Sequence, residues 1–139
     1  MQHVVTGLNA EGKSCVVSRR EIDTDPATGP FEIIASSDEL PPRLPETLVE
    51  QAAAADVGID QRGTKWLIVK WQPGIEAFFH RTDTLDYDIV LSGQVTLILE
   101  DGEVDLHPGD SVVIPGVLHS WRSGPDGGVS ATVMVALNA

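Results

Sequence analysis

The chain has 139 residues, 42% of them hydrophobic and 22% charged, which is the composition of one globular domain. Nine Lys and Arg residues stand against 21 Asp and Glu residues, so the formal net charge is −12. A surface this acidic repels phosphate backbones and anionic lipid, so we exclude nucleic acid and membrane surfaces as partners. The single cysteine, Cys15, cannot close an internal disulfide, and the first residues lack the apolar run of a signal peptide. We therefore expect a cytoplasmic protein without a membrane span.

Short apolar segments separated by turn residues predict a β-rich fold. Asp101-Gly102 indicates a tight hairpin, because both positions tolerate a positive φ. Strands this short and evenly spaced are typical of a sandwich or barrel. The expected strands are His3–Thr6, Ser14–Ser18, Phe31–Ala35, Lys65–Trp71, Glu76–Thr82, Tyr87–Leu91, Gln94–Glu100, Glu103–Leu106, Ser111–Ile114, Leu118–Arg122 and Val129–Leu137.

A long connection, Asp38–Gln61, interrupts this pattern with several prolines and then with Glu46–Asp56, which is rich in Ala, Leu, Glu and Gln. Thr47 and Glu50 fit a capping box, so we expect one short helix inside the connection. Such an insertion is either a plain surface segment or a lid over a binding site, and the sequence leaves both interpretations open.

Two of the four histidines, His80 and His119, lie on expected strands, whereas His3 and His107 are expected on the surface. Because alternate residues of a strand share one face, each strand histidine has neighbours that point the same way. If both faces point inward, imidazoles, carboxylates and aromatic rings form a concave site in an apolar wall. The residues expected there are Glu76, Phe78, His80, Thr82, Asp86, His119 and Trp121, with Asp88 on the face of Asp86.

Two segments carry a family resemblance. The first motif of the cupin superfamily, G-x5-H-x-H-x(3–4)-E-x6-G, is similar to the segment 74–93, which begins GIEAFFHRTDTLD. The second motif, G-x5-P-x-G-x2-H-x3-N, resembles the segment 109–119, GDSVVIPGVLH. The resemblance implies an all-β, single-domain cupin jelly-roll barrel over residues 1–139. Residues 1–63 would supply N-terminal strands and the connection, and residues 64–138 the barrel core.

The resemblance also implies a metal site, because metal-binding cupins usually offer three histidines and one glutamate. His80 and His119 match the first and last histidine, whereas Thr82 stands at the second histidine and Asp86 at the glutamate. Two imidazoles and one carboxylate remain the ligand type of a facial triad for non-haem iron, with manganese, nickel or zinc as alternatives. No organic cofactor is expected. The other interpretation of His80, Asp86 and His119 is a polar cluster that only stabilises the barrel.

We expect an enzyme that acts on a small, partly apolar or aromatic molecule inside the barrel. With a metal on those three side chains, the chemistry would be of oxygenase, isomerase, decarboxylase or dehydratase type. Without a metal, His80 or His119 would act as a general base, tuned by Asp86, next to a carbonyl group. Thr82 is expected beside these catalytic groups, and the expected pocket residues are Phe78, Trp121 and Glu76.

Two other functions stay open. A non-catalytic cupin that binds a small ligand would keep the same pocket without a functional metal, and Thr82 in place of a histidine favours it. A structural or interaction protein would instead need an exposed apolar patch. Exposed strand edges, together with the family resemblance, imply a homodimer.

Overall fold

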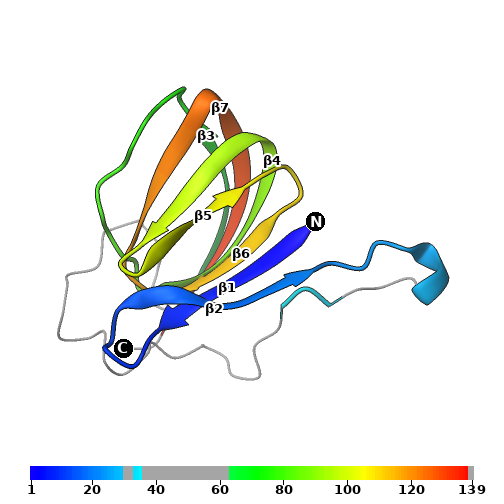
Figure 1. The fold of residues 1–139 in the computed structure, drawn as a ribbon, viewed down its shortest axis with the longest axis horizontal. Coiled ribbons are helices and arrows are strands. Elements are labelled where there is room, and N and C mark those ends of the chain that lie inside the picture. The colour runs from blue at the N-terminus through cyan, green and yellow to red at the C-terminus, as the bar shows by residue number, and fades with distance from the viewer. Residues whose placement is uncertain (30–32, 36–62, 138–139) are drawn as a thin grey trace.

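The structure is a computed structural model that describes residues 1–29, 33–35 and 63–137, and nearly all of its regular structure is β-strand (Figure 1). The one helix in these described residues, η1, is a single 3-10 turn, so no helix there is long enough to cross a membrane. The elements are β1 (Gln2–Leu8), β2 (Ser14–Glu21), η1 (Pro26–Thr28), β3 (Thr64–Trp71), β4 (Thr84–Leu99), β5 (Gly102–Leu106), β6 (Ser111–Pro115) and β7 (His119–Ala136).

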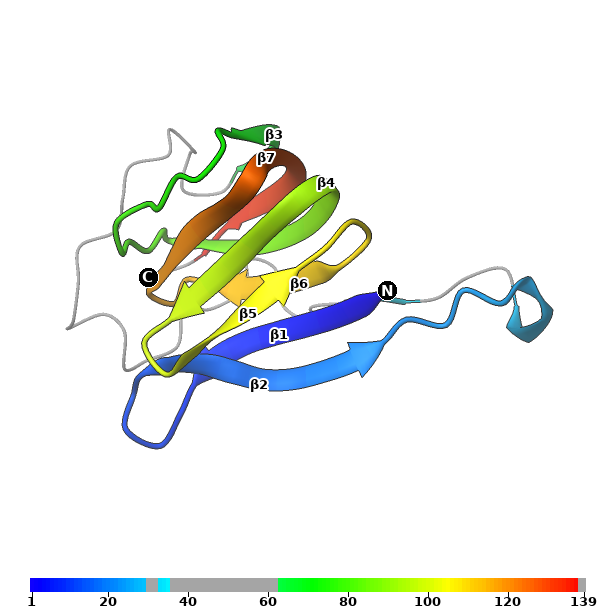
Figure 2. The same cartoon turned by 45° about the horizontal axis from the view of Figure 1, so that its top comes forward.

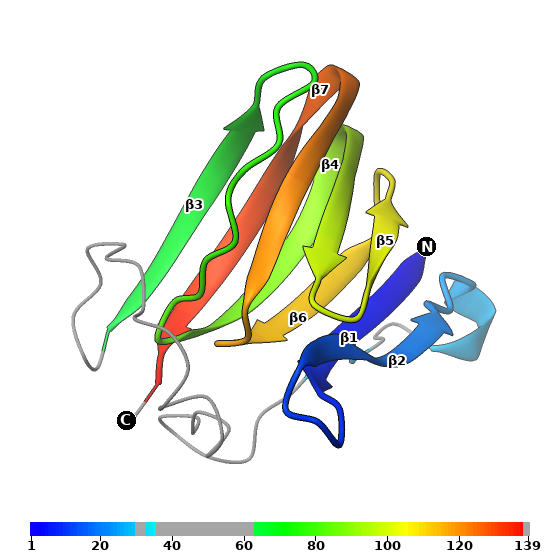
Figure 3. The same cartoon turned by 60° about the vertical axis from the view of Figure 1, so that its left-hand side comes forward.

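The strands form one curled sheet in the order β2-β1-β6-β4-β7-β3, and β5 pairs with the far end of β4. All neighbours are antiparallel except β1 and β6. Figures 2 and 3 show the consequence: β3, β7 and β4 run side by side, while β6 and the β1–β2 hairpin continue the curve below them. The predicted all-β class is confirmed.

Two long strands bend where the sequence indicated turns. β4 joins the predicted strands on either side of Gly93, and β7 joins those on either side of Gly127. Their pairing changes register next to Gly93, which has a φ of 72°. A Cβ atom there would lie 2.1 Å from the carbonyl oxygen of Gly127. Only glycine therefore allows the two strands to cross so closely while they bend.

The core lies inside the curl. Val4, Val95 and Leu97 are among its most deeply buried members, and they come from β1 and β4. β5 and β6 add further aliphatic side chains, and Trp121 of β7 closes the cluster. Burial of this kind, at about 25 cal/mol per Å² of apolar surface, is the main stabilising term for such a sheet.

The predicted strand Glu76–Thr82 is wrong. This segment has only two isolated pairings with β7, Glu76 opposite Arg122 and His80 opposite His119. Four residue steps separate the pairings on one side and three on the other. The extra residue breaks the alternation of faces, so side chains before it do not share the direction of His80.

Two further expectations need correction or lie outside the described residues. Ile33–Ala35, the described part of the predicted strand Phe31–Ala35, is not a strand, and Arg20 Nη2 donates instead to the Ile33 carbonyl oxygen at 2.9 Å. The predicted helix Glu46–Asp56, in the Asp38–Gln61 connection, lies outside the described residues.

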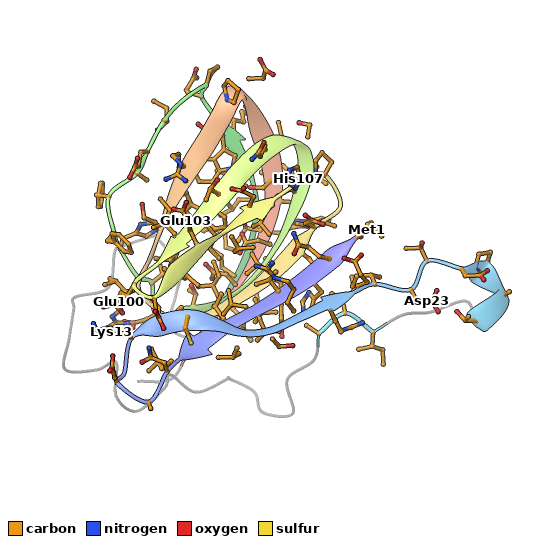
Figure 4. The ribbon with its side chains drawn as sticks, viewed as in Figure 1. Met1, Lys13, Asp23, Glu100, Glu103 and His107 are labelled. Atoms are coloured by element: carbon orange, nitrogen blue, oxygen red, sulfur yellow. The ribbon has the colours of Figure 1, made fainter. Side chains whose placement is uncertain are left out.

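The position of His3 also differs from the sequence prediction. It was expected on the surface, but it is buried, and its Nδ1 lies 2.7 Å from the Ser111 hydroxyl oxygen. Burial follows from the parallel pairing of β1 with β6, which places His3 directly opposite Ser111. His107 is exposed as expected and lies at the turn after β5 (Figure 4).

Candidate active site

A cavity of about 260 Å³ opens on the inner face of the curled sheet. Its apolar wall comes from alternate residues of β3, because Leu67, Val69 and Trp71 point inward while the residues between them point outward. Trp121 and Met134 extend this wall along β7. The polar side chains that line the cavity are His80, Thr82, Asp86, Asp88, His119 and Thr132.

The two histidines predicted from the sequence lie together. Each donates its backbone N–H to the other's carbonyl oxygen at 2.9 Å, which fixes the two residues directly opposite one another. Their ring centroids are 4.5 Å apart, with the planes tilted by 55°. Trp121 packs edge-on against His119, with centroids 5.9 Å apart. The site therefore holds a side-by-side pair of imidazoles against an indole.

Backbone carbonyls fix the tautomer of both rings. His119 Nδ1 lies 2.8 Å from the Val117 oxygen, and His80 Nδ1 lies 3.1 Å from the Phe78 oxygen. A carbonyl oxygen only accepts, so each Nδ1 carries the proton and each neutral ring keeps Nε2 as a bare acceptor. His119 is only 3% exposed. Burial, aided by the nearby His80, lowers the pKa of His119 to about 4, against the opposing Val117 hydrogen bond.

Asp86 ends a short chain of hydroxyl groups. The Thr84 hydroxyl donates to Asp86 Oδ1 at 2.5 Å, and the Thr82 and Thr84 oxygens are 2.6 Å apart. Since Thr84 has only one hydroxyl proton, Thr82 must donate to Thr84. Burial raises the pKa of Asp86 to about 6, and the Thr84 hydrogen bond opposes that rise. Thr82 stands at the position of the second motif histidine. Its hydroxyl group donates to Thr84, which in turn donates to Asp86.

Asp88, which the sequence places on the face of Asp86 without a functional role, lines the cavity. Thr132 donates to its Oδ1, while its Oδ2 is buried without a hydrogen-bond partner. Burial raises the pKa of Asp88 to about 7; the Thr132 hydrogen bond opposes this rise and the charge of Asp86 adds to it. The signal available in the sequence was the alternation of β4, which puts Asp88 two residues after Asp86 on the same face.

Of the three predicted pocket residues, one lines the cavity and two do not. Trp121 lines the cavity, as expected. Phe78 does not, because it is 81% exposed, and Glu76 is exposed opposite Arg122. The alternation of faces breaks between Ala77, which donates to the Trp121 oxygen, and His80, which pairs with His119. The placement of Phe78 and Glu76 in the pocket was therefore wrong for a local reason, the irregular backbone of residues 76–80.

The predicted metal ligands do not make a three-ligand site as they are arranged. Among residues 1–29, 33–35 and 63–137, no three His, Cys, Asp or Glu side chains are grouped so that they could hold a metal ion. His80 and His119 offer two imidazole nitrogens, whereas Asp86 Oδ1 is engaged by Thr84. The divalent metal stays a prediction, and no step proposed below runs through one.

The motifs, the curled sheet and the paired histidines agree with a comparison to protein families. The Cupin domain model matches residues 67–135, about half of the chain. The chain belongs to the cupin superfamily. Within this family, the matched segment runs from β3 to the end of β7 and contains every polar residue of the cavity.

Two relatives illustrate how the chain compares with known proteins. The chain is 38% identical over 78 residues to "Phomopsin biosynthesis cluster protein C'" of Diaporthe leptostromiformis, covering 55% of this chain and 41% of that protein. It is 29% identical over 124 residues to "Cupin-domain-containing oxidoreductase fogC" of Aspergillus ruber, covering 84% and 61%. The chain thus spans less than two thirds of the length of either relative.

A solved structure shows the same fold. A Rhizobium leguminosarum protein of unknown function superposes with a TM-score of 0.50 at 24% identity, over 53% of this chain and 71% of that one. This likeness supports the cupin architecture alone.

Proposed function

We propose that this cupin is an enzyme that moves protons on a small carbonyl compound bound in the cavity. The observation that carries the proposal is the pair of imidazoles, His80 and His119, which lines one pocket with the buried Asp86 and an apolar wall. The name of the Aspergillus ruber relative, an oxidoreductase, supports an enzyme rather than a storage protein.

His80 is the proposed base. It is the half-buried member of the pair, so a positive charge gained there stays in contact with water, whereas His119 is buried. His80 Nε2 takes a proton from the carbon next to the substrate carbonyl, and the electrons of that C–H bond form a carbon–carbon double bond. His119 positions His80 through the two reciprocal backbone hydrogen bonds.

Asp86 is the proposed acid. Its raised pKa of about 6 leaves part of the population protonated near neutral pH. As the double bond forms, the carbonyl π electrons move to oxygen, which takes the Asp86 proton. Return of the His80 proton to the same carbon, and of the oxygen proton to Asp86, restores the ketone with its α-hydrogen exchanged. In a β,γ-unsaturated carbonyl compound, return of the proton to the γ carbon instead moves the carbon–carbon double bond next to the carbonyl group and gives an isomer. All atoms and electrons balance without a co-reactant.

The apolar wall supports this chemistry and limits the substrate. Leu67, Val69 and Trp71 exclude water on one side, which strengthens the interactions of charged groups within. The volume lies just below the roughly 300–1,000 Å³ of sites for drug-sized ligands. A substrate of one ring or a short branched chain fits this space.

Hydrogen–deuterium exchange tests the proposal. The full chain is incubated in D₂O with acetophenone, its ring-hydroxylated isomers and cyclic ketones, and loss of the α-proton signal is followed by NMR. We expect exchange above the buffer rate for at least one compound, reduced by about 10²–10⁴-fold in His80→Ala. His107→Ala, which alters an exposed histidine, is the matched control and should exchange normally. Exchange at the buffer rate for all compounds would contradict the proposal.

The second candidate is a cupin that binds a small ligand without turnover. Thr82, which donates to Thr84 where the motif has a histidine, favours it. Metal analysis of protein purified without chelators bears on both candidates. Stoichiometric iron, manganese, nickel or zinc that is lost in His119→Ala would support the metal-assisted enzyme. Tight binding of a ketone without exchange, with or without added metal, would favour the binder.

A further inference from the structure

We infer that the ligand carries a hydroxyl group on the carbon next to its carbonyl group, and that His119 Nε2 accepts the hydrogen bond of that hydroxyl group. This substrate class, an α-hydroxycarbonyl compound, rests on the proposed function, which places the carbonyl group beside Asp86 and the reacting carbon beside His80. The starting observation is where the polar side chains around the cavity direct their protons.

The imidazole and hydroxyl protons of the cavity wall are already used within the protein. Both histidine rings donate from Nδ1 to backbone carbonyl oxygens. Thr82 donates to Thr84, and Thr132 donates to Asp88. The two histidines and the two threonines that line the cavity therefore offer only acceptor atoms to it. A ligand gains hydrogen bonds from these four side chains by supplying protons of its own.

The unprotonated nitrogen of His119 is open to the cavity. Its Nε2 has no hydrogen-bond partner, and among the described residues that are not themselves exposed, only Asp88 Oδ2 is both unpaired and fully buried. His119 Nε2 therefore keeps accessible surface, although the whole residue is only 3% exposed. The space that His119 borders is the cavity of about 260 Å³, so a ligand inside it can reach this nitrogen.

The proposed chemistry uses His80 and Asp86 and leaves the nitrogen of His119 without a partner. His80 Nε2 takes the proton of the reacting carbon, and Asp86 gives its proton to the carbonyl oxygen. The His119 ring lies beside that of His80, with the centroids 4.5 Å apart. A hydroxyl group on the carbon that His80 deprotonates therefore reaches the neighbouring ring by one bond and one hydrogen bond.

A neutral hydroxyl group suits this place better than a charged donor or a C–H group. Burial disfavours the charged forms of the side chains there, since it lowers the pKa of His119 to about 4 and raises the pKa of Asp86 to about 6. An ammonium group would lose its hydration in the same space. A methyl group would leave the nitrogen buried without a partner, which costs free energy. The substrate class is therefore a neutral α-hydroxycarbonyl compound with an apolar or aromatic body.

Three probes that differ at one group test this selection. α-Hydroxyacetophenone carries the hydroxyl group, α-methoxyacetophenone keeps its oxygen without the proton, and propiophenone has a methyl group in its place. Dissociation constants for the full chain are measured by calorimetry. We expect the wild-type protein to bind α-hydroxyacetophenone about tenfold more tightly than either of the other two, because only this probe satisfies the nitrogen.

Variants of His119 locate the preference. In His119→Leu, which removes the acceptor, the ratio of the dissociation constants of propiophenone and α-hydroxyacetophenone should fall to about one. His119→Gln, whose amide oxygen can accept a hydrogen bond, should retain part of the preference. His107→Gln alters an exposed histidine and is the matched control, which should retain all of it.

Nitrogen NMR of the wild-type protein gives a second measurement that does not depend on the folding of a variant. The Nε2 resonance of His119 is assigned by its absence from the spectrum of His119→Gln. It should move upfield when α-hydroxyacetophenone binds, because an accepted hydrogen bond shields an unprotonated imidazole nitrogen. It should stay in place when α-methoxyacetophenone or propiophenone is added.

The outcomes distinguish this substrate class from the proposed function. Equal affinity for the three probes, no measurable binding of α-hydroxyacetophenone, or a full preference in His119→Leu would overturn the role of His119. In each of these cases, α-proton exchange of a plain ketone that is lost in His80→Ala would still support the proposed function. A preference that depends on His119, without any α-proton exchange, would support the substrate class and contradict the proton-transfer reaction.

Discussion

The two faces of the sheet formed by β3, β7 and β4 both carry apolar side chains, and the candidate site lies on the inner one. On the inner face Leu67, Val69 and Trp71 border the cavity of about 260 Å³ that contains the histidine pair. On the outer face Trp66 is 79% exposed and Ile68 is 51% exposed. A larger cavity of about 330 Å³ lies there, bordered chiefly by apolar side chains. Cavity size therefore does not identify the site; buried titratable groups that face one another do.

The largest expected difference between the faces is catalytic. His119→Ala on the inner face should lower α-proton exchange by roughly tenfold or more, because it removes the ring that packs 4.5 Å from that of His80, although the backbone hydrogen bonds between the two residues remain. His3→Ala on the outer face removes an equally buried histidine, the one bonded to Ser111, and should leave exchange unchanged. NMR exchange rates for the two variants measure this contrast. Equal losses in both would mean that the inner pair has no special role.

The next largest difference between the two faces should be in how much their tryptophans contribute to the unfolding free energy. Trp121 is buried and its ring lies 5.6 Å from that of Trp71, so Trp121→Ala should cost about 3–5 kcal/mol of unfolding free energy. Trp66→Ala on the outer face should change it by less than about 0.5 kcal/mol. Urea unfolding followed by circular dichroism checks both values. Both values refer to protein dilute enough to be a monomer. A loss for Trp66→Ala as large as that for Trp121→Ala would contradict this contrast.

The pH dependence of stability sharpens the comparison on the inner face. Burial raises the folded-state pKa of Asp88 from 3.8 to about 7, so the folded protein holds a proton that the unfolded chain releases above pH 4. Asp88 therefore destabilises the fold increasingly between about pH 4 and pH 7. Asp88→Asn should gain stability relative to the wild-type protein over that window, reaching roughly 1–3 kcal/mol.

The low pKa of His119, about 4, makes the unfolding free energy rise with pH, opposite to the effect of Asp88. Because His119 is present in both the wild-type protein and Asp88→Asn, its contribution cancels in the difference between their unfolding free energies. Thermal unfolding at pH 4.5, 6 and 7.5 measures that difference. A difference that is constant with pH would contradict the raised pKa of Asp88.

The smallest expected effect concerns the outer face. We propose that two copies pair through it, since an exposed tryptophan and isoleucine on one strand favour association. Light scattering should find a dimer, and Trp66→Glu should make it a monomer with little change in unfolding free energy. Because each copy carries a net charge of −12, the dimer should tighten as salt is raised. A wild-type monomer at all salt concentrations would remove this proposal.

Much of the fold could be predicted from the sequence because most strand segments are short and bounded by turn residues. Ser14–Ser18, Lys65–Trp71 and Ser111–Ile114 all lie within observed strands, and the hairpin expected at Asp101-Gly102 joins β4 to β5. The sequence did not show that β4 and β7 each continue as one strand through the predicted turns. The turn residues around Gly93 bend β4 without ending it, because the partner strand β7 bends beside it.

The site was predicted where motif residues have a fixed partner and missed where the backbone is irregular. His80 and His119 were found because each belongs to a motif, and the reciprocal backbone pairing brings them together. Phe78 and Glu76 were misplaced because one extra residue before His80 changes the direction of side chains. Only the pairing with β7 reveals that residue, and it has no mark in the local sequence.

The attachment of residues 74–80 to β7 has a consequence for how the pocket is reached. The segment is held by backbone N–H groups of Gly74, Ala77 and His80, which donate to the Gly124, Trp121 and His119 oxygens. Figure 3 shows this segment running back along β7. If the segment separated from β7, His80 would move away from His119. If His80 is the base, as proposed, proton transfer requires this segment to stay paired with β7, and release of the segment would stop the reaction.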